Sequence, residues 1–493
     1  MGDVPKRLST SLASSSSSSS RSLQPIPTGG ELWMIAEERA QEILSAIQPI
    51  YVSDRSRNEI IGYIQNLIRI HLGFEVFYFG SVPLKTYLPD GDLDMTMLTP
   101  RDKEEEFAKA VCSILVAKPG DPNFPIKCVE YVPAQVKVIK FTIRNISVDI
   151  SFNQMAGLCA LCFLEQVDQI FGKDHLFKRS IILIKAWCFY ESHILGANAG
   201  LISTYALAIL VLYIMNISYS SVSDPLSVLC KFLDYYASFD WKKYCITVNG
   251  PVPISSLPDI TETGHPEVYL NENFFKECLE IYSVPTKATE AKGRFQVKHI
   301  NIMDPLKHSN NLGRSVTEGN LRRIKNAFTL GVQKMRDALT APGEAMGWKL
   351  EKFFNNTLAM NGKGQRQDVE EPVVAFGTGR AEFSQLRGDF DGYFHSLEYS
   401  KWFHGETTQQ NWIPQGQDPS SGHWYATSQN NNNFYWNNLN GSTSMQNMGK
   451  SRGTGTYIPA MSQQSYTERF SNKPNTVNSV ASTSQTQLTK QNP

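Results

Sequence analysis

The spacing of hydrophobic and polar residues changes along the chain and separates a mixed region from a helical one. Residues 53–71 carry isoleucine and leucine three and four positions apart, which is typical of a buried helix face, and Gly73 is placed to end that helix. Helices are also expected over 31–47 and 102–116. Short runs of β-branched, aromatic and alternating residues predict four strands: 75–79, 93–98, 136–143 and 146–152.

After residue 153 the pattern becomes almost wholly helical. The fold class is therefore α+β, with a small sheet and its helices followed by an all-helical domain. A cleft between two such domains is the expected place for an active site. Helices are expected over 157–171, 176–191, 200–216, 224–236, 271–282 and 317–338.

The two ends of the chain differ in composition from its middle. The first residues are rich in serine, and beyond about residue 362 aliphatic residues give way to Asn, Gln, Ser, Gly and isolated aromatics. Such segments bury too little apolar surface to offset their ordering entropy, so disordered ends are predicted. The expected divisions are a leader at 1–30, a helix packing on the central domain at 31–50, the sheet domain at 51–152, the helical domain at 153–345 and a mostly disordered tail at 346–493.

Charge and cysteine content narrow the class of protein. The 493 residues include 47 Lys and Arg and 47 Asp and Glu, so no global charge attracts nucleic acid or membrane. The 8 cysteines lack the spacing of a disulfide or zinc framework and indicate a reducing compartment. The apolar run 201–217 is shorter than the roughly 20 residues that span a bilayer, so a buried helix and no membrane partner are expected. The basic, Ser-rich beginning is also typical of organelle transit peptides, but a cytoplasmic or nuclear location is the favoured expectation.

Three aspartates on two predicted strands form the candidate catalytic group. Asp92 and Asp94 alternate with Leu93, so both carboxylates lie on one face of their strand. In the last strand, Asp149 lies on the corresponding face if the two strands are neighbours. Carboxylates that repel one another are tolerated where divalent cations neutralise them, and two Mg²⁺ ions suit phosphoryl transfer.

Gly80 and Ser81 follow the first predicted strand, ten residues before the acidic pair. Glycine lets a backbone approach a phosphate closely, and the serine hydroxyl and nearby N–H groups donate to phosphate oxygens. A surface hairpin with chance acidic residues is the plainer alternative. The ordered spacing, the apolar flanks and the third aspartate favour a phosphate site.

Five motifs in order resemble the nucleotidyltransferase superfamily founded on DNA polymerase beta, and within it the cytoplasmic-type poly(A) polymerases and terminal uridylyltransferases. The motifs are FGSVPLKTYLPDGDLDMTM, ISVDISFN, IILIKAWCFYESHI, GLISTYALAILVLYIM and IMDPLKHSNNLGRSV, and the resemblance runs over roughly residues 31–340. The resemblance implies a catalytic palm followed by a PAP/OAS1-like substrate-binding domain.

The resemblance also implies roles for individual residues. Asp92, Asp94 and Asp149 would hold two Mg²⁺ or Mn²⁺ ions, and Asp149 would help to deprotonate the attacking hydroxyl. The residues implied in nucleotide binding are Gly80 and Ser81 at the β- and γ-phosphates, Lys185 at the triphosphate, Thr204 and Tyr205 at the nucleotide, and Asp304, Lys307 and Asn310 in the recognition loop.

Some positions depart from the family pattern. A second basic residue often follows the triphosphate lysine by four positions, and here Phe189 stands there. Ala160 and Leu161 stand where an Asn-Thr pair is common, and Asn310 stands where UTP-preferring members often have His. These departures weaken the expected nucleotide contacts and leave the base, adenine or uracil, open.

The expected reaction adds AMP or UMP from an NTP to an RNA 3′-hydroxyl and releases pyrophosphate. The alternatives are a catalytically weak or inactive scaffold of the same fold and a nucleotidyltransferase that modifies a small molecule or a protein hydroxyl. The expected partners are ATP or UTP, an RNA 3′ end and a protein that binds the tail. Residues 390–405 are the aromatic-rich segment expected to dock.

Overall fold

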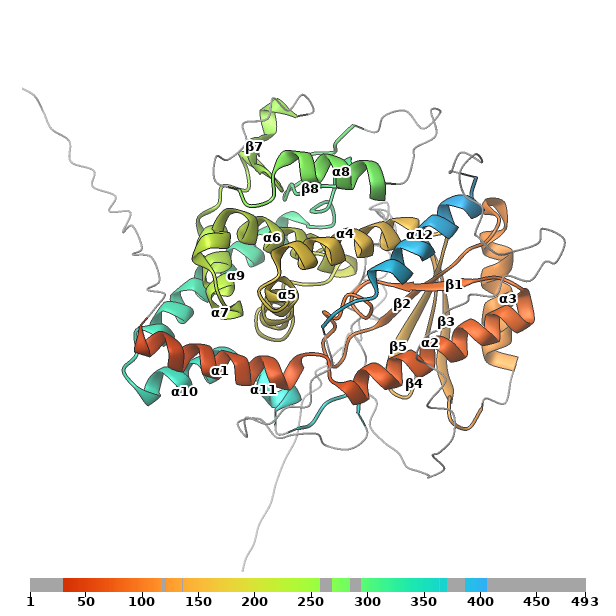
Figure 1. Ribbon diagram of the computed structural model, residues 1–493, viewed down its shortest axis with the longest axis horizontal. Coiled ribbons are helices and arrows are strands. Elements are labelled where there is room, and N and C mark those ends of the chain that lie inside the picture. Colours follow the sequence, from red (N-terminus) through yellow and green to blue (C-terminus); the bar gives the residue numbers. More distant parts are fainter. Residues whose placement is uncertain are drawn as a thin grey trace, which may run out of the picture.

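The computed structural model describes residues 30–117, 121–134, 136–257, 268–283, 294–362, 364–369 and 386–405. The predicted leader before residue 30 and the tail after residue 405 lie outside the described residues. Figure 1 shows the described chain as a sheet domain beside a helical domain.

A five-stranded mixed sheet forms the first domain, in the order β1-β2-β5-β4-β3. β2 and β5 are parallel, and the other neighbours are antiparallel. Arg144 and Asn145 join β4 to β5 with φ of 48° and 63°, as a two-residue hairpin turn requires. The strands are β1 (Val76–Phe79), β2 (Leu93–Met97), β3 (Ile126–Pro133), β4 (Lys137–Ile143) and β5 (Ile146–Phe152).

The helices α2 (Tyr51–Leu72) and α3 (Glu104–Ala117) pack with the sheet around one core. Alternation puts Leu93 and Met95 of β2 into this core, where both are fully buried. The acidic side chains between and before them therefore belong to the opposite face. Gly73 ends α2 in the left-handed conformation with φ 72°, as the sequence predicts.

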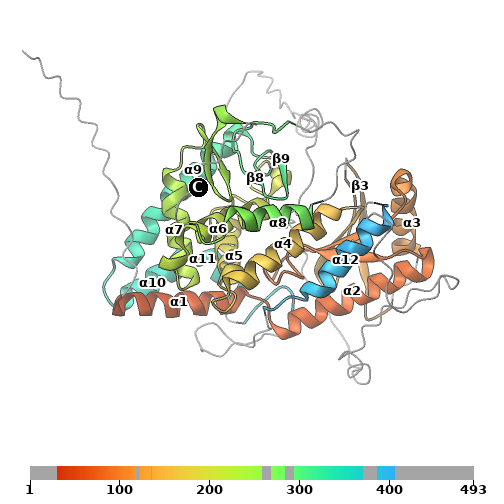
Figure 2. The same ribbon diagram turned by 45° about the horizontal axis from the view of Figure 1, so that its top comes forward.

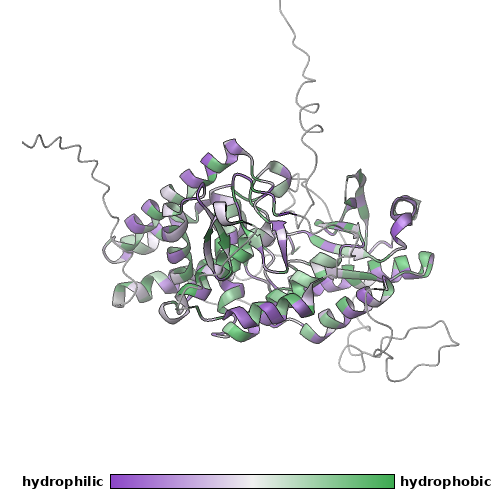
Figure 3. Cartoon of the chain, turned by 90° about the horizontal axis from the view of Figure 1, so that it is seen from above, coloured by the Kyte–Doolittle hydropathy of each residue, from purple (hydrophilic) through white to green (hydrophobic). Residues whose placement is uncertain are grey.

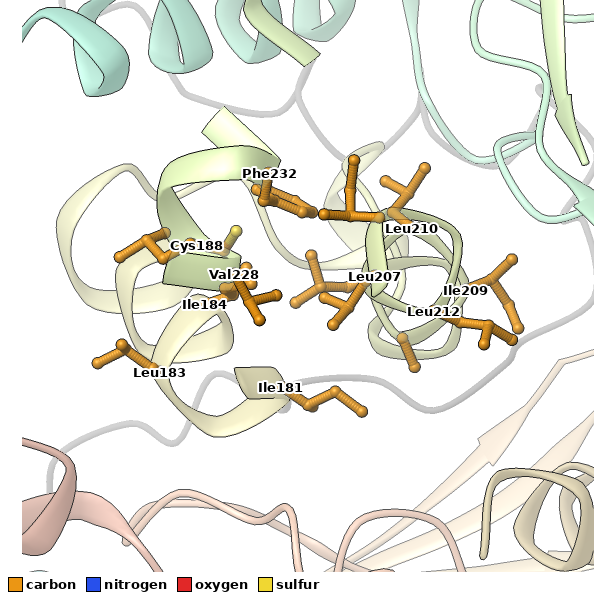
Figure 4. Close-up of a cluster of buried hydrophobic side chains, with 14 of the residues drawn as sticks. Ile181, Leu183, Ile184, Cys188, Leu207, Ile209, Leu210, Leu212, Val228 and Phe232 are labelled. Atoms are coloured by element: carbon orange, nitrogen blue, oxygen red, sulfur yellow. The ribbon is translucent and has the colours of Figure 1, made fainter. Parts of the chain in front are cut away.

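The second domain is helical and begins with α4 (Met155–Phe171) and α5 (Leu176–Ala186). The other helices of this domain are α6 (Thr204–Ser218), α7 (Pro225–Ser238), α8 (Glu272–Tyr282) and α9 (Glu318–Leu339). α5, α6 and α7 meet through a dense cluster of aliphatic side chains, shown in Figure 4, and Figure 3 shows hydrophobic residues gathered where the helices meet.

The segment Thr204–Ser221 is long and apolar enough to cross a membrane, yet Ala206 to Asn216 are all buried among these helices. That burial is typical of a core helix.

Two small hairpins, which the sequence analysis missed, complete the second domain. β6 (Tyr244–Thr247) pairs with β7 (Gly250–Pro253), and β8 (Met303–Asp304) pairs with β9 (Lys307–Asn311). Their strands have two to five residues, too short for a clear alternating pattern.

Three helices lie where the sequence predicted a mostly disordered tail, so that prediction is wrong for these residues. They are α10 (Glu344–Phe353), α11 (Asn355–Asn361) and α12 (Phe390–Phe403). α10 and α11 pack against α1 (Glu31–Ile47), which also contacts α5 and α7. These helices were missed because the composition of the tail was judged as an average. Their few apolar residues are nevertheless buried against the core.

α12 is the segment predicted to dock, and it docks on its own chain. Figures 1 and 2 both show it running beside α4, and Figure 1 shows it near β1 at the edge of the sheet domain. Tyr393 packs edge-on against Tyr78, and Tyr399 packs against Phe77. α12 therefore contacts both domains.

Candidate active site

The acidic residues come together on the β2–β5 pair. Asp94 lies directly opposite Asp149 in the parallel register, and Asp92 immediately precedes β2. Leu93 fixes this arrangement because its burial in the core orients β2. The structure thus confirms that the two predicted strands are neighbours.

Asp92 is 5% exposed, and its Oδ1 atom has no hydrogen-bond partner among the described residues. Burial, reinforced by the charge of Asp149, raises the pKa of Asp92 to about 7. Burial also raises the pKa of Asp149, against the opposing effect of its ion pair with Lys140 on β4. The carboxylates of Asp92 and Asp149 are therefore close together and largely buried, and a bound cation would stabilise their charged forms.

The donor chemistry of the site fits divalent metal ions. Within the described ranges, no three His, Cys, Asp or Glu side chains are already close enough together to coordinate one metal ion. Lys140 instead provides the positive charge at Asp149. The unpartnered Asp92 oxygen and the all-carboxylate set are nevertheless what Mg²⁺ or Mn²⁺ prefers.

The loop from Gly80 to Gly91 connects β1 to the acidic strand. Gly80 has φ 78°, a conformation that favours glycine, and the turn is held by Thr86 N–H donating to the Ser81 carbonyl at 2.9 Å. Gly80 and Ser81 are both half-buried. They lie at the end of β1, next to the strand that carries Asp94, as expected for a phosphate-binding turn.

Lys185 lies under this loop. Its ammonium donates to the Thr86 carbonyl at 3.1 Å, and burial lowers the pKa of Lys185 to about 8, against the attraction of Asp94, Asp90 and Asp92. Lys185 lies on an apolar helix, where a lysine can extend its side chain to solvent instead of binding a ligand. Its burial among these carboxylates excludes that arrangement.

A π-helical segment, Trp187–Glu191, extends α5. Its wider turn means that the side chain four positions after Lys185 is no longer the one that faces the loop on the same side as Lys185. Tyr190 donates its hydroxyl to Asp90 Oδ1 at 2.6 Å, so Lys185 and Tyr190 both reach the 86–90 segment. Phe189, at the position where the family often has a second basic residue, is half-buried and packs edge-on against Tyr190. No local pattern of residues predicts this π-helix, so the contact between Tyr190 and Asp90 was missed in the sequence analysis.

The predicted nucleotide-recognition residues form a second group around Asp304. This carboxylate accepts from Tyr205 at 3.2 Å and from Asn310 at 2.7 Å, while Arg314 donates to the side-chain Oδ1 of Asn310. Burial raises the pKa of Asp304 against these contacts. Lys307 is exposed on β9.

In the part of the chain that the structure describes, the side chains of Thr204, Ala160 and Leu161 make no polar contact with the two groups of residues above. Thr204 is the first residue of α6, next to Ser203, which caps the helix by accepting from Ala206 N–H at 3.1 Å. Thr204 is half-buried, and none of its side-chain hydrogen bonds within the described chain joins it to the Asp304 group. On α4, Leu161 is buried in the core and Ala160 is half-buried, so no polar side chain replaces the family's Asn-Thr pair.

Comparisons with known families match the two domains of this chain in turn. Residues 37–166 match the family described as poly(A) RNA polymerase, mitochondrial-like, central palm domain, and residues 171–358 match the PAP/OAS1 substrate-binding domain. Together these matches cover more than half of the chain. The chain belongs to the poly(A) polymerase-type nucleotidyltransferases. The predicted family and fold class are confirmed, and the palm match of this nucleotidyltransferase extends into α4.

Individual relatives are distant. Poly(A) RNA polymerase gld-4 of Caenorhabditis elegans is 22% identical over 320 residues, and the match covers 60% of this nucleotidyltransferase and 32%, about a third, of that relative. Protein HESO1 of Arabidopsis thaliana is 21% identical over 431 residues, covering 78% of this chain and 82% of HESO1. A solved structure of the terminal uridylyl transferase Cid1 is similar with a TM-score of 0.46 and 18% identity, covering 64% of this chain and 96% of Cid1.

Proposed function

We propose that this protein is a template-independent RNA nucleotidyltransferase that adds AMP or UMP to an RNA 3′-hydroxyl. The observation that carries the proposal is the pairing of Asp94 with Asp149 beside a buried Asp92 that has an unpartnered oxygen. The family matches on both domains support the same reaction.

In the proposed reaction, the RNA 3′-oxygen attacks the α-phosphorus of the NTP. The bond between this phosphorus and the α–β bridging oxygen breaks, and pyrophosphate leaves. Asp149 accepts the hydroxyl proton, and its burial supports this role because a raised pKa makes a carboxylate a better base near neutral pH. Divalent ions held by Asp92, Asp94 and Asp149 would neutralise the charge of the phosphates.

The remaining residues position the nucleotide. Gly80 and Ser81 would receive the β- and γ-phosphates, and Lys185 would supply a positive charge that burial leaves poorly solvated. Tyr205 would stack on the base, beside the Asp304 and Asn310 pair that faces its edge. Asn310 presents both an amide donor and a carbonyl acceptor, so this pair suits adenine or uracil.

A non-catalytic scaffold is the second candidate. It is favoured by the apolar side chains at Phe189, Ala160 and Leu161, which remove polar partners for the nucleotide. The intact aspartate group favours the enzyme.

Tail extension separates the two candidates. Purified protein is incubated with a labelled single-stranded RNA, Mg²⁺ or Mn²⁺ and each NTP separately. We expect extension with ATP or UTP that the Asp92→Ala/Asp94→Ala variant loses by at least about a hundredfold, while the exposed pair Asp102→Ala/Asp121→Ala retains it. No extension with any NTP or metal from folded protein would support the scaffold.

We also propose a cytoplasmic or nuclear location. All eight cysteines lie in the described part of the chain without forming a disulfide there, and six of them are buried, as in proteins of reducing compartments. Imaging of the full chain with a C-terminal fluorescent tag tests this, and accumulation in an organelle would contradict it.

A further inference from the structure

The loop from Gly80 to Gly91 joins β1 to β2, and side chains from other elements hold it near both of its ends. Near its beginning, Tyr393 on α12 donates its hydroxyl to the Pro83 carbonyl at 2.8 Å. Near its end, Arg57 on α2 donates to the carbonyls of Pro89 at 3.4 Å and Gly91 at 3.2 Å. Pro83 is two residues after Ser81, and Gly91 directly precedes Asp92.

The Tyr393 contact is well supported. Tyr393 is buried, and α12 is anchored at its start by the buried ion pair of Glu165 and Lys178. Lys178 donates to the Leu386 carbonyl at 2.7 Å, and Gly388 N–H donates to Glu165 at 3.0 Å. α12 is therefore fixed before it reaches the loop.

α12 also contacts α8 of the second domain. Near the end of α12, Lys401 donates to the Ile281 carbonyl at 2.7 Å, and from its first half Phe390 and Phe394 pack edge-on against Tyr282. α12 thus contacts both α8 and the loop.

The Arg57 contact depends on a second C-terminal segment. Asp368 accepts from Arg57 at 2.8 Å, and Arg366 donates to Asp368 at 3.0 Å and to the Gln48 carbonyl at 2.9 Å. Arg57 also lies over the Tyr87 ring at 4.1 Å. Arg57 and Asp368 are fully buried, and the two guanidinium groups hold the pKa of Asp368 low despite its burial. The guanidinium group of Arg57 is therefore fixed by the Asp368 carboxylate, which comes from the segment 364–369 and not from the sheet domain.

We propose that Tyr393 and Asp368 are positioning residues for NTP binding. They act through the loop that carries Gly80, Ser81 and Asp92, and the inference rests on the proposed function. Neither residue would touch the nucleotide. Tyr393 fixes a loop carbonyl directly and Asp368 fixes two others through Arg57, so that the loop N–H groups and the Asp92 carboxylate are set before the NTP arrives. Preorganised donors of this kind lower the free energy lost on binding.

Tyr393→Phe tests the proposal because it removes one oxygen and keeps the ring. We expect KM for the NTP to rise about threefold to tenfold, the effect of losing one neutral hydrogen bond. The expected kcat stays within about twofold, and KM for RNA is unchanged, since the loop faces the triphosphate. The matched control is Tyr399→Phe on the same helix, whose hydroxyl has no hydrogen bond within the described residues.

A binding measurement keeps the test independent of catalysis. The dissociation constant of a non-hydrolysable NTP in Mg²⁺ should rise by the same factor in Tyr393→Phe and not in Tyr399→Phe. Asp368→Asn should raise it too, and Asp368→Glu should restore part of the affinity. Equal NTP affinity and equal KM in the two tyrosine variants would overturn the inference. Absence of extension by the wild type would instead overturn the proposed function, and the binding comparison would still decide the role of Tyr393.

Discussion

At the scale of single residues, Asp92 and Lys185 are oppositely charged groups that are both buried at the loop from Gly80 to Gly91. Burial raises the pKa of Asp92 to about 7 and lowers the pKa of Lys185 to about 8. Burial disfavours the charged form of each group, so charging either of them near neutral pH costs stability. A bound metal and a triphosphate would relieve that cost.

The Asp92 carboxyl predicts how stability depends on pH in metal-free protein. Its folded pKa of about 7 lies above the ordinary value of 3.8, so between these values the folded state retains a proton that the unfolded state has lost. The contribution of Asp92 to stability therefore falls as pH rises through this window. In EDTA, Asp92→Asn should raise Tm by ~5 °C at pH 8 and by less at pH 5.

Added Mg²⁺ gives the control for this prediction. It should raise Tm of the wild type more than Tm of Asp92→Asn, because the variant has lost a charged ligand. An Asn variant that is less stable than the wild type at pH 8 in EDTA would contradict the raised pKa.

Lys185 gives a prediction about the nucleotide. Lys185→Met removes the charge and keeps most of the side-chain volume, so KM for the NTP should rise about tenfold to a hundredfold, as for a lost charge-assisted hydrogen bond. Tm should not fall, because a buried charge is replaced by an apolar group. Steady-state kinetics with the exposed Lys334→Met as control measures this, and equal KM values would leave Lys185 with a structural role alone.

At the scale of elements, α12 is attached through a buried ion pair. Lys178→Met leaves Glu165 charged and unpaired, and should lower the free energy of unfolding by about 3–5 kcal/mol. Glu165→Gln/Lys178→Met removes both charges and should recover most of the loss. Urea unfolding measures both variants, and equal stability of the single and double variants would show that pairing is not what holds the segment.

Gly388 shows how closely the segment before α12 approaches the pair. A Cβ atom at this position would collide with the Glu165 carboxylate. The approach lets the Gly388 N–H bond to Glu165, which explains why a glycine precedes the helix.

The elements differ in how far the sequence predicted them. β2 and β5 were predicted because apolar and acidic residues alternate along them, and the same alternation identified the aspartates. β3 was missed because it is an edge strand whose residues are exposed or half-buried, so its hydrophobic pattern is weak. The aromatic density of 390–403 indicated a docking segment, but the surface that it meets is formed by distant parts of the chain.

At the scale of the whole molecule, the limits of sequence prediction follow from distance along the chain. The family motifs located the aspartates, the glycine turn and Lys185, because each is defined by its neighbours. The contact between Arg57 and Asp368 joins residues 311 apart, and that between Tyr393 and Pro83 joins residues 310 apart. No local pattern reports such pairs, so the second set of loop contacts was not predictable.

Truncation tests the extent of the folded body. A chain ending at Gly405 retains every contact described for α12 and should keep Tm within about 2 °C of the full chain. A chain ending at Gly362 loses Asp368 and Tyr393 and should be less stable by several kcal/mol, since it leaves Arg57 as an unpaired buried charge. Thermal unfolding of the two chains measures the difference, and equal Tm values would show that 364–405 adds nothing to the fold.

The buried Arg57–Asp368 pair has a consequence for the order of folding. During synthesis, α2 and the strands that carry the aspartates emerge long before residue 368 exists. The nascent palm therefore holds an unneutralised arginine at the base of its active loop until most of the chain is made. Contacts of such long sequence separation form slowly, so this pair closes only after residue 368 has been made, and α12, which follows it in the chain, joins the loop later still.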